Sequence, residues 1–201
     1  METVVVIDFE TTGLDPGWGD RAIEIAIVVV RDGSIVDSYQ SLMNPGRRIP
    51  AEVTQLTGIT NDMVARAPLA SKVMREASRF VGSKPVVAHN ASFDRKFWDA
   101  ELERLSLSTT MPFACTMLLS RRLYPDSPNH KLATLVDFLK LPKAGRAHRA
   151  MADAQMASHL WSRIQNDVAK SYGVRGVCHE ILTCVQRVPR AQVPTLLGSY
   201  R

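Results

Sequence analysis

Two acidic residues, Asp8 and Glu10, stand two positions apart at the end of an apolar segment near the N-terminus. The segment is rich in valine, which predicts a β-strand over residues 4–9. Side chains two apart on a strand point to the same face, so both carboxylates would lie on one side. At about 4 Å and an effective dielectric constant of about 20, they would repel by about 4 kcal/mol. A divalent cation such as Mg²⁺ removes this repulsion, so the pair predicts a metal site. An ordinary acidic strand end is the alternative for such a pair taken alone.

A second group of polar residues follows a short apolar run at residues 85–88, which predicts another strand. His89, Asn90 and Asp94 come next, where a helix is predicted to begin. Asn90 suits the N-cap position, and Asp94 would lie in the first turn, where the helix dipole favours a carboxylate. Asp94 is therefore either a helix-capping charge or a further metal ligand.

The third group is His148 and Asp153. On one regular helix, residues five apart are rotated by about 500°, which would place these two side chains about 140° apart. Gly145 upstream and the alanine-rich run downstream instead predict that the helix begins after His148. His148 would then lie on a loop, as suits a general base, and Asp153 on a helix, as suits a metal ligand. The alternative is a surface histidine and a solvated aspartate.

Hydrophobic patterning predicts an α/β or α+β layer fold around these residues. Strands are predicted first and helices dominate afterwards. The predicted strands cover residues 4–9, 22–30, 35–43 and 85–88. The predicted helices cover residues 69–81, 93–102, 117–123, 132–139, 150–168 and 178–185. We expect two parts: a domain over residues 1–167, and a basic extension over residues 168–201 with one short helix and a tail.

Composition narrows the class of protein. The chain has 201 residues, of which 45% are hydrophobic and 22% charged, and this excludes disordered, collagen-like and coiled-coil proteins. The formal charge of +5 is compatible with a polyanionic partner. Three cysteines without a CxxC pair favour reduced thiols. No apolar run is long enough for a membrane span, and the acidic N-terminus is unlike a secretory signal. We therefore expect a cytoplasmic protein that does not bind membranes.

Taken together, the three groups resemble the motifs of the DnaQ-like 3′→5′ exonucleases of the DEDDh group, over roughly residues 3–167. The first motif, D-x-E-T-T-G-L, is matched by Asp8, Glu10, Thr11, Thr12, Gly13 and Leu14. The second, H-N-A-x-F-D, is matched by His89, Asn90, Ala91, Phe93 and Asp94. The third, H-x₄-D, is matched by His148 and Asp153. The order and separation of the three motifs make the resemblance specific.

The resemblance implies an RNase H-like α/β fold, with a mixed central sheet of about five strands flanked by helices. It also implies two divalent metal ions, Mg²⁺ or Mn²⁺. Asp8, Glu10 and Asp153 would hold the first ion, and Asp8 with Asp94 the second. His148 would accept the proton of the attacking water, and nucleoside 5′-monophosphates would leave from a 3′ end.

The resemblance implies substrate contacts as well. Thr11, Thr12, Gly13 and Leu14 would meet the terminal sugar and base, together with Asn90 and Phe93. Leu14 or Phe93 would lie against a base, although both could instead be core residues. Glu24, inside an apolar strand, is assigned a structural role, and His89 is expected to be a structural or rim residue rather than a catalyst.

The expected substrate is single-stranded DNA with a free 3′ end. RNA, as for RNase T or oligoribonuclease, is the nearest alternative, and a non-catalytic adaptor for a polymerase or sliding clamp is the third. The basic extension could help to hold nucleic acid, and residues 192–197 faintly resemble clamp-binding peptides. A C-terminal helix packed on the core is the simpler expectation for that segment. Whether the chain forms a homodimer stays open.

Overall fold

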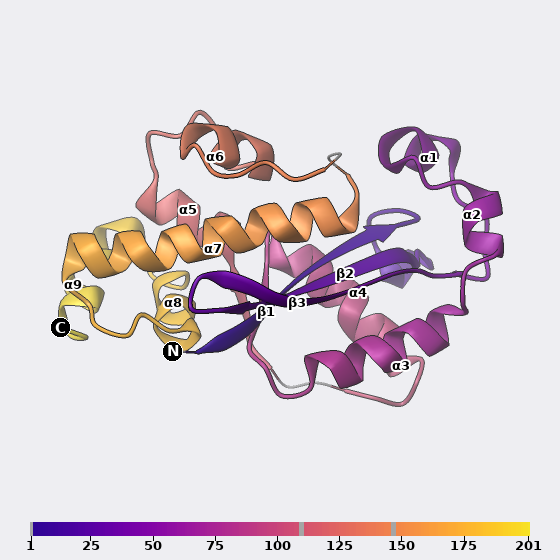
Figure 1. Ribbon diagram of the computed structural model, residues 1–201, viewed down its shortest axis with the longest axis horizontal. Coiled ribbons are helices and arrows are strands. Elements are labelled where there is room, and N and C mark those ends of the chain that lie inside the picture. The colour runs from indigo at the N-terminus through magenta and orange to yellow at the C-terminus, as the bar shows by residue number, and fades with distance from the viewer. Residues whose placement is uncertain (1, 109–110, 146–147) are drawn as a thin grey trace.

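A computed structural model describes residues 2–108, 111–145 and 148–201 as a five-stranded sheet between helices (Figure 1). The sheet order is β3-β2-β1-β4-β5. Its strands are β1 (Thr3–Thr11), β2 (Ala22–Arg31), β3 (Ser34–Leu42), β4 (Val86–Ala88) and β5 (Phe113–Cys115). The first three strands are antiparallel, whereas β4 and β5 run parallel to β1. The predicted mixed α/β sheet is therefore confirmed.

Helices cover both faces of the sheet (Figure 1). The long helix α7 (Ala150–Tyr172) lies on one face, and α3 (Ala70–Val81) and α4 (Ala91–Glu103) lie on the other. The remaining helices are α1 (Ala51–Thr57), α2 (Asn61–Ala65), α5 (Thr116–Leu123), α6 (Leu132–Phe138), α8 (His179–Val185) and α9 (Val193–Gly198), with single 3₁₀ turns η1 (Pro16–Trp18) and η2 (Arg190–Gln192). The sequence analysis missed β5, α1, α2 and α9, which are too short to show a clear periodicity.

Alternation along β1 decides which face each side chain joins. Val4 and Val6 pack into the core beneath α7, whereas Val5, Ile7 and Phe9 pack beneath α3 and α4. Even-numbered residues of this strand thus face α7. Asp8 belongs to the even-numbered set, at the point where the apolar core on that face ends.

The C-terminal residues complete the sheet. The backbone N–H of Cys115 donates to Gln186 Oε1 at 2.6 Å, and Gln186 Nε2 donates to the carbonyl of Phe113 at 3.0 Å. One amide side chain thereby pairs with the open edge of β5, as a further strand would. The helix expected over residues 178–185 is α8, and α9 follows it.

Residues 192–197 do not form an extended docking peptide. They run into α9, and Val193 and Leu197 are buried in the same core as α7. This placement supports the packed C-terminal helix rather than the clamp-binding likeness. Among the described residues, we find no helix that is both long and apolar enough to cross a membrane.

Candidate active site

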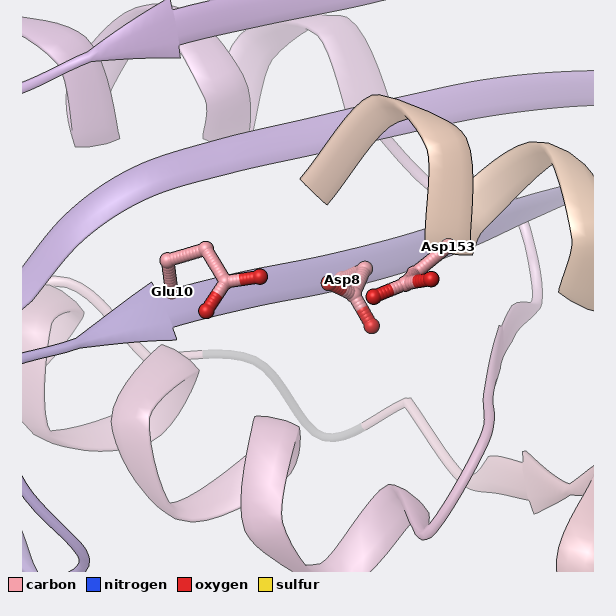
Figure 2. Close-up of side chains that lie close together, drawn as sticks. All are labelled: Asp8, Glu10 and Asp153. Carbon is pink, nitrogen blue, oxygen red and sulfur yellow. The ribbon is translucent and has the colours of Figure 1, made fainter. Parts of the chain in front are cut away.

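Three carboxylates from two distant segments meet at one end of the sheet. Figure 2 shows Asp8 and Glu10 on β1, with Asp153 on the first turns of α7 beside them. One oxygen from each lies within 4.8 Å of the others, close enough to share a cation. The strand spacing puts Asp8 and Glu10 on one face, and the packing of α7 on that face brings Asp153 to them.

Asp94 approaches the same strand from α4. Its side chain is buried, and its Oδ1 accepts a hydrogen bond of 3.1 Å from the backbone N–H of Phe9. The Asp94 carboxylate thus binds β1 at Phe9, the residue between Asp8 and Glu10. Asn90 precedes this helix with a left-handed backbone (φ 61°), and among the described residues its side chain makes no capping bond. Asn90 therefore occupies the predicted N-cap position, but without the side-chain hydrogen bond that usually accompanies it.

The carboxylates raise one another's pKa. Burial, followed by the charges of Asp94 and Asp153, raises the pKa of Asp8 well above its usual value. Burial and the charge of Asp153 raise the pKa of Glu10 to about 8, and burial raises the pKa of Asp94 to about 8. Several carboxylates held together at this energetic cost are the donor set that hard divalent cations prefer. The residues present therefore fit a divalent metal site.

His148 lies on the loop that enters α7. The helix begins at Ala150, so the prediction that it starts after His148 is confirmed. His148 is exposed and has a left-handed backbone (φ 58°). Its N–H donates to Asp153 Oδ2 at 3.1 Å, which places the histidine backbone directly beside the acidic cluster.

The turn that follows β1 is organised by its own polar side chains. Thr11 Oγ1 donates to the carbonyl of Gly13 at 2.6 Å, and the N–H of Arg21 donates to Thr12 Oγ1 at 3.0 Å. Both threonines are buried, so their side chains hold the turn together. A Cβ on Gly13 would lie 2.3 Å from Asp20 Oδ2, so the turn leaves no room for a side chain there.

The two apolar candidates for base contact differ in exposure. Leu14 is 74% exposed at the tip of the turn. Phe93 is half-buried, with its ring centroid 5.0 Å from that of Phe97 and Lys96 Nζ 5.7 Å from its centre. The exposed Leu14 is available to a ligand, whereas Phe93 also serves the packing of α4.

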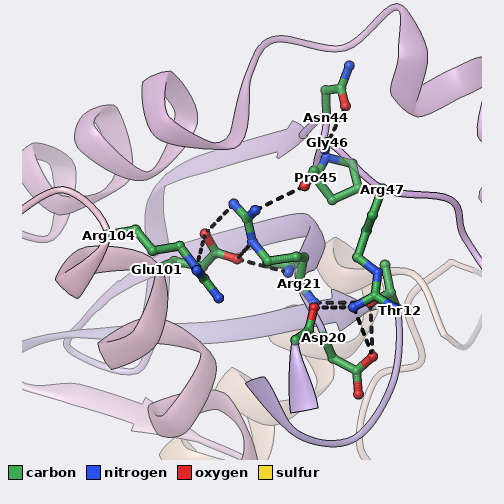
Figure 3. A network of polar contacts seen from close by, with 11 residues as sticks. Thr12, Asp20, Arg21, Asn44, Pro45, Gly46, Arg47, Glu101 and Arg104 are labelled. Atoms are coloured by element: carbon green, nitrogen blue, oxygen red, sulfur yellow. Dashed lines mark hydrogen bonds and ion pairs between the residues drawn. The ribbon is translucent and has the colours of Figure 1, made fainter. Parts of the chain in front are cut away.

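Two buried ion pairs support the site. Glu24, assigned only a structural role from the sequence, binds Arg149 at the start of α7. Glu101, which the sequence analysis did not consider, binds Arg21 in a network that reaches the turn after β1 (Figure 3). Isolated acidic residues within buried segments were the available signal, since such charges need partners.

His89 has the structural role assigned to it. Its ring nitrogens lie 2.9 Å from Thr116 Oγ1 and 3.1 Å from the carbonyl of His130. Burial lowers the pKa of His89 to about 4, so the ring is neutral near pH 7 and links the end of β4 to α5 and the following loop.

Comparison with known proteins agrees with this architecture. The family model described as Exonuclease (RNase_T) matches residues 5–160. The PolC-type DNA polymerase III of Bacillus cereus is 38% identical over 168 residues, and that of Bacillus subtilis is 37% identical over 171 residues. These matches cover 83% and 84% of this chain but 12% of each polymerase, so the chain spans about an eighth of these relatives.

Solved structures give the same result at the level of the fold. Exonuclease X in complex with 5′-overhanging duplex DNA has a TM-score of 0.68 and 30% identity, covering 97% of this chain and 99% of that chain. The nuclease domain of 3′hExo, a DEDDh family member bound to rAMP, has a TM-score of 0.69 and 22% identity, covering 83% of this chain and 92% of that one. The fold is thus the RNase H-like fold of the DEDDh nucleases. The chain belongs to the exonuclease family.

Proposed function

We propose that this chain is a metal-dependent 3′→5′ exonuclease that releases nucleoside 5′-monophosphates from single-stranded DNA ends. The observation that carries the proposal is the meeting of Asp8, Glu10 and Asp153, with the backbone of His148 bonded to Asp153. A non-catalytic adaptor would gain nothing from carboxylates that raise one another's pKa.

In this proposal, Asp8, Glu10 and Asp153 would hold one Mg²⁺ or Mn²⁺ ion, and Asp8 and Asp94 would hold a second. Such ions lower the pKa of water and stabilise charge at the phosphate. His148 would accept the proton of the attacking water, because an exposed imidazole beside the cluster can act as a general base. The buried Asp94 also holds α4 against β1 through its hydrogen bond with the backbone N–H of Phe9.

The turn after β1 would receive the 3′-terminal nucleotide. Leu14 offers an exposed apolar contact for a base of any identity, and Thr11, Thr12 and Gly13 would present backbone groups to the sugar. Asn90 and Phe93 would complete the pocket from the start of α4.

The polymerase relatives and exonuclease X favour DNA over RNA, whereas the 3′hExo domain is bound to rAMP. The polymerases are DNA polymerases, and the structure of exonuclease X contains duplex DNA. We infer that the chain acts in DNA replication or repair, where a 3′→5′ exonuclease associated with a polymerase would remove misincorporated nucleotides.

A direct test uses purified protein and a 5′-labelled single-stranded DNA oligonucleotide. We expect a ladder that shortens from the 3′ end with Mg²⁺ or Mn²⁺ and no ladder with a chelator. Asp8→Ala and Asp153→Ala should each abolish the ladder, whereas Asp126→Ala, an exposed aspartate outside the cluster, should not. Digestion that survives both of the first two substitutions would exclude the proposed site.

Matched DNA and RNA oligonucleotides decide the substrate. Faster cleavage of DNA supports the proposal, and faster cleavage of RNA would replace it with an exoribonuclease. A 3′-labelled substrate that shortens from its 5′ end would contradict the proposed direction.

A further inference from the structure

Glu24 is a fully buried carboxylate beside the acidic cluster that we do not assign to metal binding. In the register of β1 and β2 it lies directly opposite Glu10, and its exposed fraction is 0%. A lone buried carboxylate at this position would add to the repulsion within the cluster. The hydrogen bonds of Glu24 instead connect it to β3 and to the start of α7.

Four donors satisfy the two oxygens of Glu24. Oε1 accepts from Gln40 Nε2 at 2.9 Å and from Arg149 Nη2 at 2.8 Å. Oε2 accepts from Arg149 Nε and from the backbone N–H of Ala150, both at 3.1 Å. Arg149 therefore binds in the two-point geometry that only a guanidinium supplies. Glu24 thus binds Arg149, the last residue before α7, and Ala150, the first residue of the helix.

Glu24 thereby caps α7 from a different element. Among the described residues, Arg149 makes no side-chain cap of its own for this helix, and Ala150 has one of the N–H groups that an α-helix leaves unpaired. The carboxylate also lies at the positive end of the helix dipole. One buried side chain on β2 thus fixes the backbone of residues 149 and 150 against the sheet.

The adjacent residue is His148. Unlike Asp153, which is held within a helix that packs along the sheet, His148 is exposed, and its backbone is held by the bond to Asp153 and by its covalent link to Arg149. We propose that the Glu24–Arg149 ion pair is a positioning device that sets the place of His148 relative to Asp8, Glu10 and Asp153. The proposal rests on the function proposed above, because it assigns the pair to the proton-transfer step of that site.

The double variant Glu24→Gln/Arg149→Met tests this without leaving a buried charge unpaired. Its kcat with Mn²⁺ on the p-nitrophenyl ester of thymidine 5′-monophosphate should fall about 10²-fold, as expected when a reacting group is displaced by about 1 Å. The KM and the Mn²⁺ affinity, measured by calorimetry, should stay within about threefold of wild type, because the ligands of the metal remain in place.

His148→Ala supplies the readout that a merely structural role would not change. If the pair acts through His148, adding the double variant to His148→Ala should cause no further loss of kcat. An equal loss in both backgrounds, or a fall in Mn²⁺ affinity that parallels kcat, would overturn the inference. The control Arg163→Met removes another ion pair of α7, with Asp167, and should leave kcat unchanged even if it lowers the Tm.

Arg149→Lys is the conservative variant, and it also serves if the double variant fails to fold. It keeps the charge beside Glu24 but loses the two-point bond, so kcat should fall less than in the double variant, again with no further loss in the His148→Ala background. A kcat equal to wild type would overturn the inference. A wild-type protein that cannot cleave the ester would instead overturn the proposed function itself.

Discussion

Two ion pairs in this protein are built alike but hold different parts of it. Glu101 on α4 binds Arg21 Nε at 2.7 Å and Nη2 at 2.9 Å, and accepts the N–H of Ala22 at the start of β2. Glu24 on β2 binds Arg149 in the same two-point manner and accepts the N–H at the start of α7. Each buried carboxylate thus fixes the first residue of another element.

The surroundings of the two pairs differ. Arg21 also donates to the carbonyl of Pro45 and, through its N–H, to Thr12, so the Glu101 pair joins three chain segments (Figure 3). The Glu24 pair lies next to His148 and opposite Glu10. The comparison teaches that the same buried unit has a role set by its neighbours: cohesion of the turn in one place and, in our proposal, placement of a reacting group in the other.

The largest expected effect on stability belongs to the Glu101 pair. Glu101→Ala leaves Arg21 in a mostly buried position without its carboxylate, at a cost of about 3–5 kcal/mol in the free energy of unfolding. The Tm measured by circular dichroism should fall by about 10 °C. Glu103→Ala, at an exposed position of the same helix, is the control and should change the Tm little. A small change in both variants would show that the pair contributes little to folding.

A smaller effect should follow from filling the turn that the Glu101 pair supports. In Gly13→Ala the new Cβ meets the Asp20 carboxylate, so the turn must shift, at a cost of about 1–3 kcal/mol. We expect a lower Tm and a raised KM for oligonucleotides. Gly198→Ala, with open space around the added Cβ, is the control. A KM equal to wild type in Gly13→Ala would separate the turn from substrate binding.

Metal removal probes the other region, where Glu24 and the cluster lie. Because the folded-state pKa of Glu10 is raised from 4.5 to about 8, its ionisation favours the unfolded chain. The protonated Glu10 therefore stabilises the folded state relative to the ionised form. This stabilisation is fully present below pH 4.5 and is lost as the pH rises through about 8. The pKa of His89 is lowered from 6.5 to about 4, so protonation of His89 favours the unfolded chain. The resulting gain in stability with rising pH is complete by pH 6.5.

Between pH 6.5 and 8, the change in stability therefore reports the ionisation of the carboxyl groups and not that of His89. With a chelator present, we expect the Tm to fall by about 5 °C across this range, because Glu10 alone contributes about 2 kcal/mol. Added Mg²⁺ should restore the Tm at pH 8, because a bound cation stabilises the ionised carboxylates. A Tm that is independent of both pH and Mg²⁺ would contradict a metal site at this cluster.

The smallest expected effect is at the tip of the turn. Leu14→Ala should leave the Tm unchanged because the side chain is 74% exposed. It should lower kcat/KM for single-stranded DNA about fivefold, equivalent to about 1 kcal/mol of base contact. Leu56→Ala, which removes another exposed leucine on α1, is the control and should have no effect on DNA cleavage. Equal kcat/KM values for the two variants would exclude Leu14 from substrate binding.

Much of the fold was predictable, because β1, β2 and α7 each carry a clear apolar pattern and turn residues precede β3. The missed elements have seven residues or fewer, and over such lengths strands, helices and loops can share the same pattern, although the equally short β4, α6 and α8 were predicted. Within the site, the spacing of Asp8 and Glu10 and the start of α7 after His148 were predictable from local rules. The use of Thr12 inside its own turn was not, since it depends on Arg21, nine positions further along the chain.

The sequence by itself determined the local facts: which side chains share a face of β1, and where α7 begins. Both follow from the repeat of strand and helix and from the residues that start a helix. Only the tertiary structure decided the partners of Glu24 and Glu101, which bind arginines 125 and 80 positions away. Nothing in the local spacing encodes such pairs, because their formation depends on how the sheet and helices close around the buried charge.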